Sequence, residues 1–278
     1  MDIGHVKFIK PKHPLLQKWI KGYYVHKSLD PSFSSKVTFY QNITTTLSIY
    51  KNSYTKSNGR HREQHFKINN EYSCLLVGLV DKYQEVSFYG PLDRVAIVFY
   101  SGGLNHFVKD PLSQYLEIHF SIFNYFGLDL NTLLDKVYET NELKEKRDLL
   151  DNFFVQRFNP LQDKVLLDAI EIINDEDELL KVHDLAVALN VNRRTLLRKF
   201  RKHLGYSPEE YLSVVKFRKA LYKFQETQSS LSLTDIAYDS HYYDQSDFNH
   251  NLKRRTGLTP KELFAQLNIV DNTLFWKV

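Results

Sequence analysis

The chain has 278 residues and a formal net charge of +4, and 42% of its residues are hydrophobic. This length accommodates one large domain or two ordinary ones, each with a buried core. The one cysteine, Cys74, excludes an intrachain disulfide and a cysteine-built zinc site, and its apolar neighbours predict a buried hydrophobe rather than a nucleophile. With neither a signal-peptide pattern nor an apolar run of about 18 residues, the chain is expected in the cytoplasm, without a membrane span.

Residues 1–158 are predicted to form an α+β domain that is β-rich, and we consider a cupin-like arrangement for it. Strand-like runs rich in aromatic and β-branched residues occur at 36–50, 74–80 and 94–100. Apolar residues at spacings of three and four then predict helices over 111–127, 130–139 and 142–158. The pair Asn159-Pro160 is typical of a domain boundary.

The stretch HREQH at 61–65 places two histidines four residues apart, as two metal ligands on a helix would be. Its surroundings are rich in Asn, Gly and Lys and offer no credible third ligand. A loop or strand edge is therefore favoured, and neither a metal nor another cofactor is expected. The many aromatic residues of this half could line an effector pocket or fill a core, so the sequence assigns no effector-binding residue.

The segment GYSPEEYL at 205–212 reappears as GLTPKELF at 257–264. Gly205 is expected to end one helix in a left-handed conformation, and Ser207, followed by Pro208, is expected to cap the next with Glu210 completing a capping box. The second copy repeats each role. This frame is a junction between two helices, and its recurrence predicts that a helical unit is used twice.

Each junction follows a short helical segment, a tight turn and a longer helical segment, which is helix-turn-helix spacing. Ala186 and Ala237 occupy the small-residue position at which two helices cross closely. Asn190 and His241 fall where the turn requires a left-handed residue, which both can adopt. We therefore predict an all-α domain over 159–278, with helix-turn-helix units at about 182–204 and 232–256 joined by a long helix over 208–225.

Positive charge is concentrated in this half, with ten Lys or Arg against two Glu between residues 193 and 223. Charge alone leaves open a polyanion partner or a solvated helix face. The outward rows of the two longer helices carry side chains that can read bases: Arg194, Arg198, Gln245, Ser246, Asn249 and His250. The flanking cations suit phosphate contacts: Arg193, Lys199, Arg201, Lys202, Lys253, Arg254 and Arg255. The role of the acidic run at 171–178, a solvated loop or a latch over the basic face, stays open.

Residues 163–264 resemble the AraC/XylS family of bacterial transcription regulators, most specifically in SLTDIAYDSHYYDQSDFNHNLKRRTGLTPKEL. The resemblance implies two recognition helices in adjacent major grooves of double-stranded promoter DNA. Two departures stand out, because His241-Tyr242 replaces the usual Gly-Phe and Phe264 replaces an arginine. FYSGG at 99–103 resembles more weakly a Phe-x-Pro-Gly-Gly stretch of sensor domains in such regulators.

The sequence thus predicts a DNA-binding transcription regulator, an activator by family analogy, whose N-terminal half binds a small-molecule effector, mediates dimerisation, or both. RNA polymerase is a partner by the same analogy. Two alternatives remain at this stage. One is an enzyme in the N-terminal half that is tethered to DNA, and the other is a protein whose helix-turn-helix units bind a protein partner.

Overall fold

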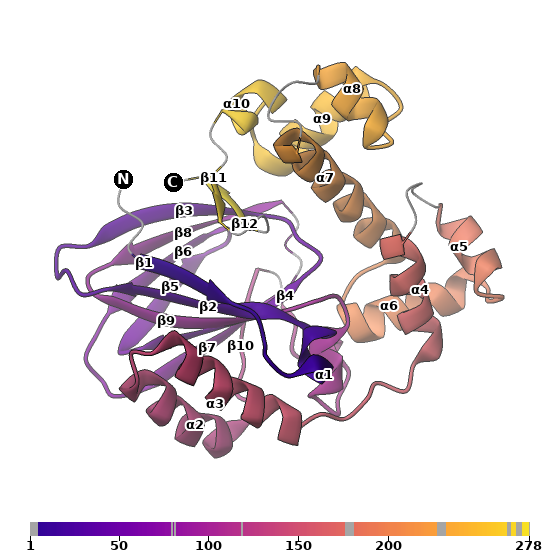
Figure 1. The fold of residues 1–278 in the computed structure, drawn as a ribbon. Helices are drawn as coiled ribbons and strands as arrows, with labels where there is room; N and C mark the ends of the chain where they lie inside the picture. The colour runs from indigo at the N-terminus through magenta and orange to yellow at the C-terminus, as the bar shows by residue number, and fades with distance from the viewer. Residues whose placement is uncertain are drawn as a thin grey trace. The chain divides into compact units, whose positions relative to one another are not determined.

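A computed structural model describes residues 5–78, 80, 82–117, 119–175, 181–226, 232–265, 268–270 and 274–277. Contacts divide the chain into two compact units (Figure 1). The first unit contains residues 1–37, 44–78 and 85–162, and the second contains residues 38–43, 79–84 and 163–278. Two short segments of the N-terminal half therefore belong to the unit that carries the C-terminal helices.

Sheet A lies wholly in the first unit, and its neighbouring strands are antiparallel. Its strands follow the order β1 (His5–Ile9), β2 (Ile20–Ser28), β9 (Leu92–Phe99), β4 (Thr45–Lys51), β7 (Tyr72–Val77) and β10 (Ser121–Ile122). Sheet B contains β3 (Ser34–Tyr40), β8 (Tyr83–Tyr89), β6 (His61–Phe66) and β5 (Ser53–Asn58) in that order, with β6 and β8 parallel. The sequence-predicted strands correspond to β3, β4, β7 and β9.

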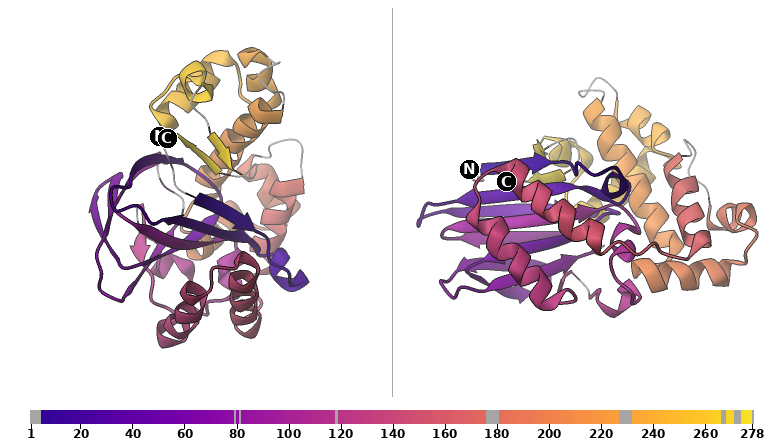
Figure 2. Two further views of the ribbon diagram at one scale, coloured as in Figure 1. Left: turned by 60° about the vertical axis from the view of Figure 1, so that its left-hand side comes forward. Right: turned by 60° about the horizontal axis from the view of Figure 1, so that its bottom comes forward.

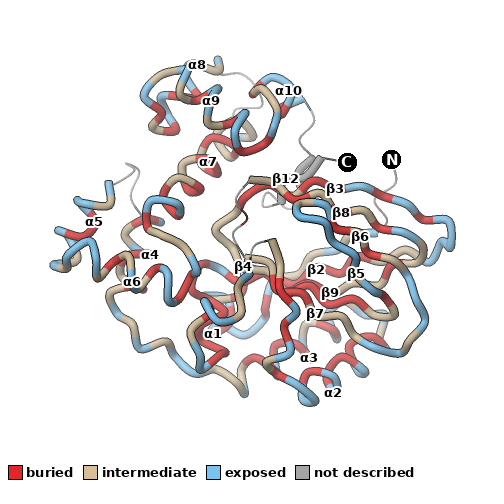
Figure 3. Tube along the Cα trace, turned by 180° about the vertical axis from the view of Figure 1, so that it is seen from behind, coloured by how far each residue is buried: buried red, intermediate tan, exposed pale blue. Residues whose placement is uncertain are grey.

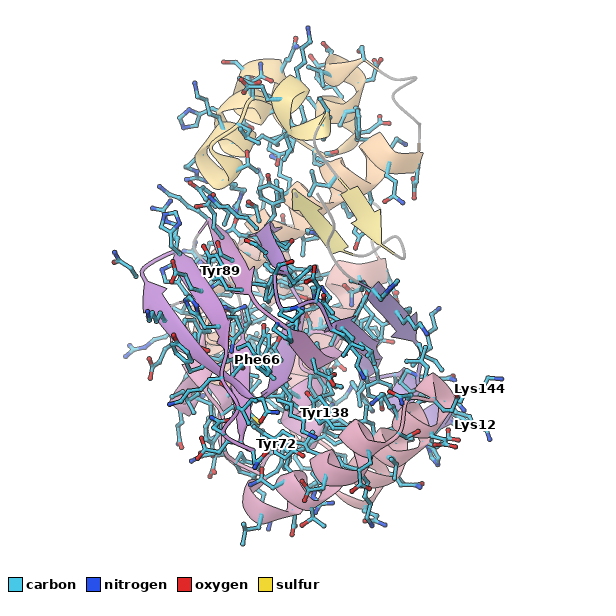
Figure 4. The ribbon with its side chains drawn as sticks, turned by 90° about the vertical axis from the view of Figure 1, so that its left-hand side faces the viewer. Lys12, Phe66, Tyr72, Tyr89, Tyr138 and Lys144 are labelled. Atoms are coloured by element: carbon cyan, nitrogen blue, oxygen red, sulfur yellow. The ribbon has the colours of Figure 1, made fainter. Side chains whose placement is uncertain are left out.

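The apolar core of the first unit lies between sheet A and the helices α2 (Gly127–Glu139) and α3 (Leu143–Gln156), which cover one face of the sheet (Figure 2). Alternate residues of each strand face this core. Leu47 and Ile49 of β4 are fully buried there, and Figure 3 shows the central strands of the sheet as largely buried. The Tyr138 hydroxyl of α2 donates to the Ile49 carbonyl at 2.8 Å, and its ring stacks beside Tyr72 (Figure 4). This face combines aliphatic packing with satisfied polar groups.

The helix predicted over 111–127 is wrong. This segment contains a short 3-10 helix, η2 (Leu112–Gln114), and then strand β10. Ser121 and Ile122 pair with Leu76 and Leu75 of β7, which makes β10 the edge strand of sheet A. Phe123 and Phe126 are buried in the core at a spacing that happens to match a helix. The predicted helices at 130–139 and 142–158 are confirmed as α2 and α3.

Two smaller predictions of the N-terminal half can be compared with the structure. HREQH forms most of strand β6, which lies between β8 and β5 rather than in a loop or at a sheet edge, and there the His61 ring pairs with Glu85 at 2.6 Å and His65 with Glu63 at 2.8 Å. Among the residues that the structure describes, no group of His, Cys, Asp or Glu could hold a metal ion. Cys74 packs against the core, and burial raises the pKa of its thiol to about 12.

Helices dominate the second unit: α4 (Lys164–Asp175), α5 (Val182–Ala188), α6 (Arg193–Leu204), α7 (Pro208–Glu226), α8 (Leu233–Asp239), α9 (Gln245–Thr256) and α10 (Pro260–Phe264). They are followed by two short strands, β11 (Asn268–Val270) and β12 (Leu274–Lys277), which an all-α domain does not contain. β12 pairs with residues 38 and 39 of β3, which belong to this unit. The first five residues of the acidic run at 171–178 form the last part of α4, which ends at Asp175. Residues 176–178 lie outside the described residues. No described helix is long and apolar enough to cross a membrane.

Candidate nucleic-acid interface

The repeated frame forms the same junction in both copies. Gly205 ends α6 with a φ of 81°, and Gly257 ends α9 with a φ of 75°. The Ser207 hydroxyl accepts from the Glu210 amide at 3.2 Å, while the Ser207 amide donates to the Glu210 carboxylate at 2.8 Å. Thr259 and Glu262 exchange the equivalent bonds at 3.3 and 2.8 Å. The helix ends and both capping boxes predicted from the sequence are confirmed.

The tight turns of the two units are also equivalent. Asn190 and His241 have φ angles of 51° and 61°, so the left-handed prediction is confirmed for both. The amide after each turn residue donates to an alanine carbonyl of the preceding helix, at 3.0 Å for Ala186 and 2.9 Å for Ala237. Both alanines are buried. A larger side chain at either position would have to displace neighbouring side chains, because protein interiors are closely packed.

Helix α6 presents a row of arginines to solvent. Asn192 caps its start, since the Asn192 side chain accepts from the Thr195 amide at 2.8 Å. Leu196 and Phe200 are fully buried, whereas Arg194, Arg198 and Arg201 are exposed on another face of the helix. Arg193 and Lys202 are exposed as well. The row carries five cations whose side chains form no ion pair within the described part of the chain.

Lys199 occupies a different environment from the other cations of α6. Its Nζ lies 2.8 Å from each carboxylate oxygen of Asp163, next to the start of α4. Burial opposes the charge of Asp163, but the hydrogen bonds from Lys199 and from the Leu166 amide hold its pKa below the ordinary value. Lys199 therefore ties α6 to α4 in this structure and is not presented to a phosphate, which differs from the sequence-based expectation.

Helix α9 presents uncharged polar groups where α6 presents arginines. Asp244 caps the helix by accepting from the Asp247 amide at 2.7 Å, and Phe248 and Leu252 face the core. Gln245, Ser246, Asn249 and His250 are exposed, as the outward row requires. The Gln245 side chain accepts from the Thr234 hydroxyl of α8 at 3.1 Å, which fixes the position of its amide. The predicted base-reading residues of each unit are thus brought together on one exposed helix face.

The last cations of α9 divide into two kinds. Lys253 and Arg254 are exposed, as phosphate contacts require. Arg255 is only 6% exposed, and its guanidinium donates to the side chains of Gln41 and Ser213. Burial lowers the pKa of this guanidinium. The expectation that Arg255 contacts phosphate does not fit this geometry, because the side chain is buried and both terminal guanidinium nitrogens already have acceptors within the unit.

Phe264 replaces the arginine that the family resemblance implies, and the structure gives this residue a packing role. Its ring stacks on Phe224 of α7 with the centroids 3.7 Å apart and the planes 6° from parallel. The same cluster contains Tyr40, Phe217 and Leu263. The aromatic side chain therefore joins α10 to the long helix by burying apolar surface.

Sequence reasoning missed Tyr243, which immediately precedes the cap of α9. Its side chain is 86% exposed, and its amide donates to the Asp247 carboxylate at 3.2 Å. An exposed tyrosine at the N-terminal end of a recognition helix can donate to a phosphate oxygen. The tight turn at His241 followed by the Asp244 cap is the local signal that could have indicated this position.

Residues 185–266 match a protein family described as a helix-turn-helix domain. The chain is 28% identical over 148 residues to the uncharacterized HTH-type transcriptional regulator YtdP of Bacillus subtilis, which covers 49% of this chain and 18% of that protein. It is 31% identical over 102 residues to the HTH-type transcriptional activator RhaS of Yersinia pestis, covering 37% of this chain and 36% of RhaS. The chain therefore spans well under half the length of these relatives.

Solved structures were also found to be similar. A transcriptional regulator with an AraC-type DNA-binding domain from Chromobacterium violaceum is 26% identical, with a TM-score of 0.33, over 37% of this chain and 90% of that one. ToxT from Vibrio cholerae is 18% identical, with a TM-score of 0.43, over 87% of this chain and 97% of ToxT. Together with the two junctions and turns, the family match shows that residues 185–266 carry a helix-turn-helix domain.

Proposed function

We propose that the protein is a sequence-specific transcription regulator of bacteria that binds double-stranded promoter DNA through both helix-turn-helix units. The observation that carries this proposal is the pair of equivalent units with exposed outer rows, arginine-rich on α6 and amide-rich on α9. Arginine can bind guanine bidentately, and glutamine and asparagine can bind adenine in the same way. A protein partner would not require this combination of cations and base-matching amides.

The helix between the units has a length that suits two successive grooves. α7 contains 19 residues, or roughly 28 Å at 1.5 Å per residue. Successive major-groove faces of one duplex are about 34 Å apart. One chain can thus place α6 and α9 in adjacent turns of the same DNA, with Arg193, Arg201, Lys202, Lys253 and Arg254 contacting phosphates.

The finer assignments belong to the same proposal. The regulator acts in the cytoplasm as an activator, a direction supported by the RhaS relatives, and contacts RNA polymerase at the promoter. Its N-terminal half, residues 1–158, responds to a small-molecule effector and supports a homodimer. A regulatory rather than an enzymatic role is supported by its relatives, which are described as transcriptional regulators and activators.

The test is selection of the full-length protein on randomised duplexes at about 50 and 200 mM salt, a range over which phosphate contacts weaken binding steeply. We expect two short motifs about one helical turn apart. Arg198→Ala should relax one motif and Gln245→Ala the other. Enrichment of no sequence in either salt, with the full chain and with added effector candidates, would contradict the proposal.

A further inference from the structure

The two faces of sheet A differ in chemistry. On β4, Leu47 and Ile49 face the apolar core beside α2 and α3, so Ser48 and Tyr50 face the opposite side, toward sheet B. Both are buried, and the Tyr50 ring lies 6.5 Å from the ring of Phe88 on β8. The side of sheet A that faces sheet B is therefore inaccessible to solvent, yet it carries hydroxyl groups where the other side carries aliphatic groups.

Arg62 of β6 brings a positive charge into this layer. Its side chain is 3% exposed, and its guanidinium lies 5.3 Å from the ring of Phe120. Nε and Nη1 of Arg62 have no hydrogen-bond partner among the described residues, and no described carboxylate pairs with it. Burial lowers the pKa of this guanidinium, Tyr50 raises it, and the nearby charge of Arg94 lowers it. A buried charge without a counter-ion is costly and is seldom kept for stability.

A second arginine lies in the same layer. The guanidinium of Arg94 on β9 is 5.6 Å from the Tyr50 ring, and its Nη2 donates to the Ser48 hydroxyl at 2.8 Å. The Nε of Arg94 and the Tyr50 hydroxyl are buried without a partner within the described part of the chain. Two guanidinium groups and a hydroxyl group in this layer thus have donors without an acceptor. The two guanidinium groups also carry like charges, which repel each other.

Arg255 in the other unit is a buried arginine with more acceptors. Its Nη1 and Nη2 donate to the Gln41 side chain and the Ser213 hydroxyl, whereas its Nε has no partner among the described residues. Arg62 has no equivalent acceptor among the described residues. A small pocket nearby is lined in part by Ser53, Gln64 and Phe88, but not by Arg62, Arg94 or Tyr50.

We propose that the layer between sheets A and B binds a small organic anion, a carboxylate or a phosphate ester, with Arg62 and Arg94 as its counter-ions and the Tyr50 hydroxyl as a further donor. Planar guanidinium groups match the oxygens of both anions in bidentate geometry. The anion satisfies the unpaired donors and neutralises the repulsion between the two arginines. Its role as the effector rests on the proposed regulatory function, whereas its binding does not.

The experiment is thermal unfolding of the full-length protein at constant ionic strength with three probes: inorganic phosphate, acetate and benzoate. We expect at least one probe to raise the midpoint by about 3 °C or more at saturation, because a ligand that binds the folded state stabilises it. Arg62→Met should abolish this rise. Without a probe, Arg62→Met should unfold at the same temperature as the parent or higher, since it removes an unpaired buried charge.

Two control variants locate the effect. Lys56→Met removes a charge from the exposed side of the adjacent strand β5 and should keep the full rise. Arg198→Ala removes an exposed cation from the DNA-binding helix and should keep it too. If Arg62→Met does not fold, Arg94→Met provides the same comparison, because Arg94 is less deeply buried.

The proposal is overturned if none of the three probes stabilises the parent protein, if the rise persists in Arg62→Met or its substitute, or if it is lost in Arg198→Ala instead. The assay contains no DNA. A failure of anion binding therefore leaves the duplex selection intact, and a failure of that selection leaves the unfolding result intact.

Discussion

The two helix-turn-helix units have the same backbone design and different surroundings. Both use a left-handed turn residue, a glycine stop and a capping box. The first unit presents Arg194, Arg198 and Arg201 to solvent, whereas the second presents amide and hydroxyl groups and turns Arg255 inward to Gln41. The scaffold of such a unit therefore fixes where an outward row lies but not its chemistry. The first row suits electrostatic attraction, and the second suits discrimination between bases.

The second unit also depends on residues from far earlier in the chain. Tyr40 belongs to its core together with Phe217 and Phe248, and Gln41 accepts from Arg255. Tyr40 is the last residue of β3 and Gln41 follows it, so the end of one strand of the N-terminal half takes part in the packing of the second helix-turn-helix unit. The comparison can be tested by substitutions at matched positions.

The largest expected effect comes from truncating the two matched core phenylalanines. Phe200 of α6 and Phe248 of α9 are both fully buried, and replacing either by alanine should lower the free energy of unfolding by about 3–5 kcal/mol, as for other buried aromatics. Urea unfolding of the full chain measures this. Amide hydrogen exchange should then show that Phe248→Ala also deprotects residues 38–43, while Phe200→Ala leaves them protected. Equal deprotection by both variants would contradict the difference between the units.

DNA affinity should separate the two outward rows. Arg198→Ala should weaken operator binding by roughly 10- to 100-fold and reduce the salt dependence, because a cation is lost. Gln245→Ala should relax base preference at the other half-site and leave the salt dependence unchanged, since it carries no charge. Fluorescence anisotropy with the selected duplex across a salt series measures both quantities. The same change in salt dependence for the two variants would argue against the assignment.

The pair formed by Arg255 and Gln41 should behave as a coupled contact rather than as a DNA contact. A double-mutant cycle of Arg255→Met and Gln41→Ala should give a coupling of about 0.5–3 kcal/mol in the free energy of unfolding, the range for residues that share a hydrogen bond. Arg254→Met is the matched control, because Arg254 is the exposed neighbour. It should reduce the salt dependence of DNA binding, and Arg255→Met should not. Additive stability effects would show that the contact is dispensable.

Local signals made much of the C-terminal unit predictable. Gly205, Ser207 and Glu210 act within six residues of one another, so their roles follow from helix capping without knowledge of the tertiary fold. The outward rows follow from helical periodicity in the same way. The hydrogen-bond partners of Lys199 and Arg255 could not be predicted from the sequence, because Asp163 and Gln41 lie 36 and 214 residues away from them.

The N-terminal half was predictable only in part, for a related reason. Strand β10 is defined by its pairing with β7, about 46 residues earlier in the chain, and its apolar residues mimic helical spacing. Likewise, nothing near Arg62 in the sequence indicates burial, since HREQH is polar throughout. Its position follows from the alternation of β6 against the facing sheet, which the structure alone supplies.

The smallest effect should come from the turn residues, which differ in their tolerance of a left-handed backbone. His241 and Asn190 have φ angles of 61° and 51°, and this conformation costs roughly 1 kcal/mol for most residues but less for asparagine. Glycine removes that cost in the folded state, but it also increases the conformational entropy of the unfolded chain, which lowers stability. His241→Gly should therefore raise the urea midpoint of the full chain slightly, and Asn190→Gly should leave it unchanged or lower it. A midpoint that falls equally in both variants would contradict the prediction, because it would mean that the left-handed backbone at His241 carries no more strain than the one at Asn190.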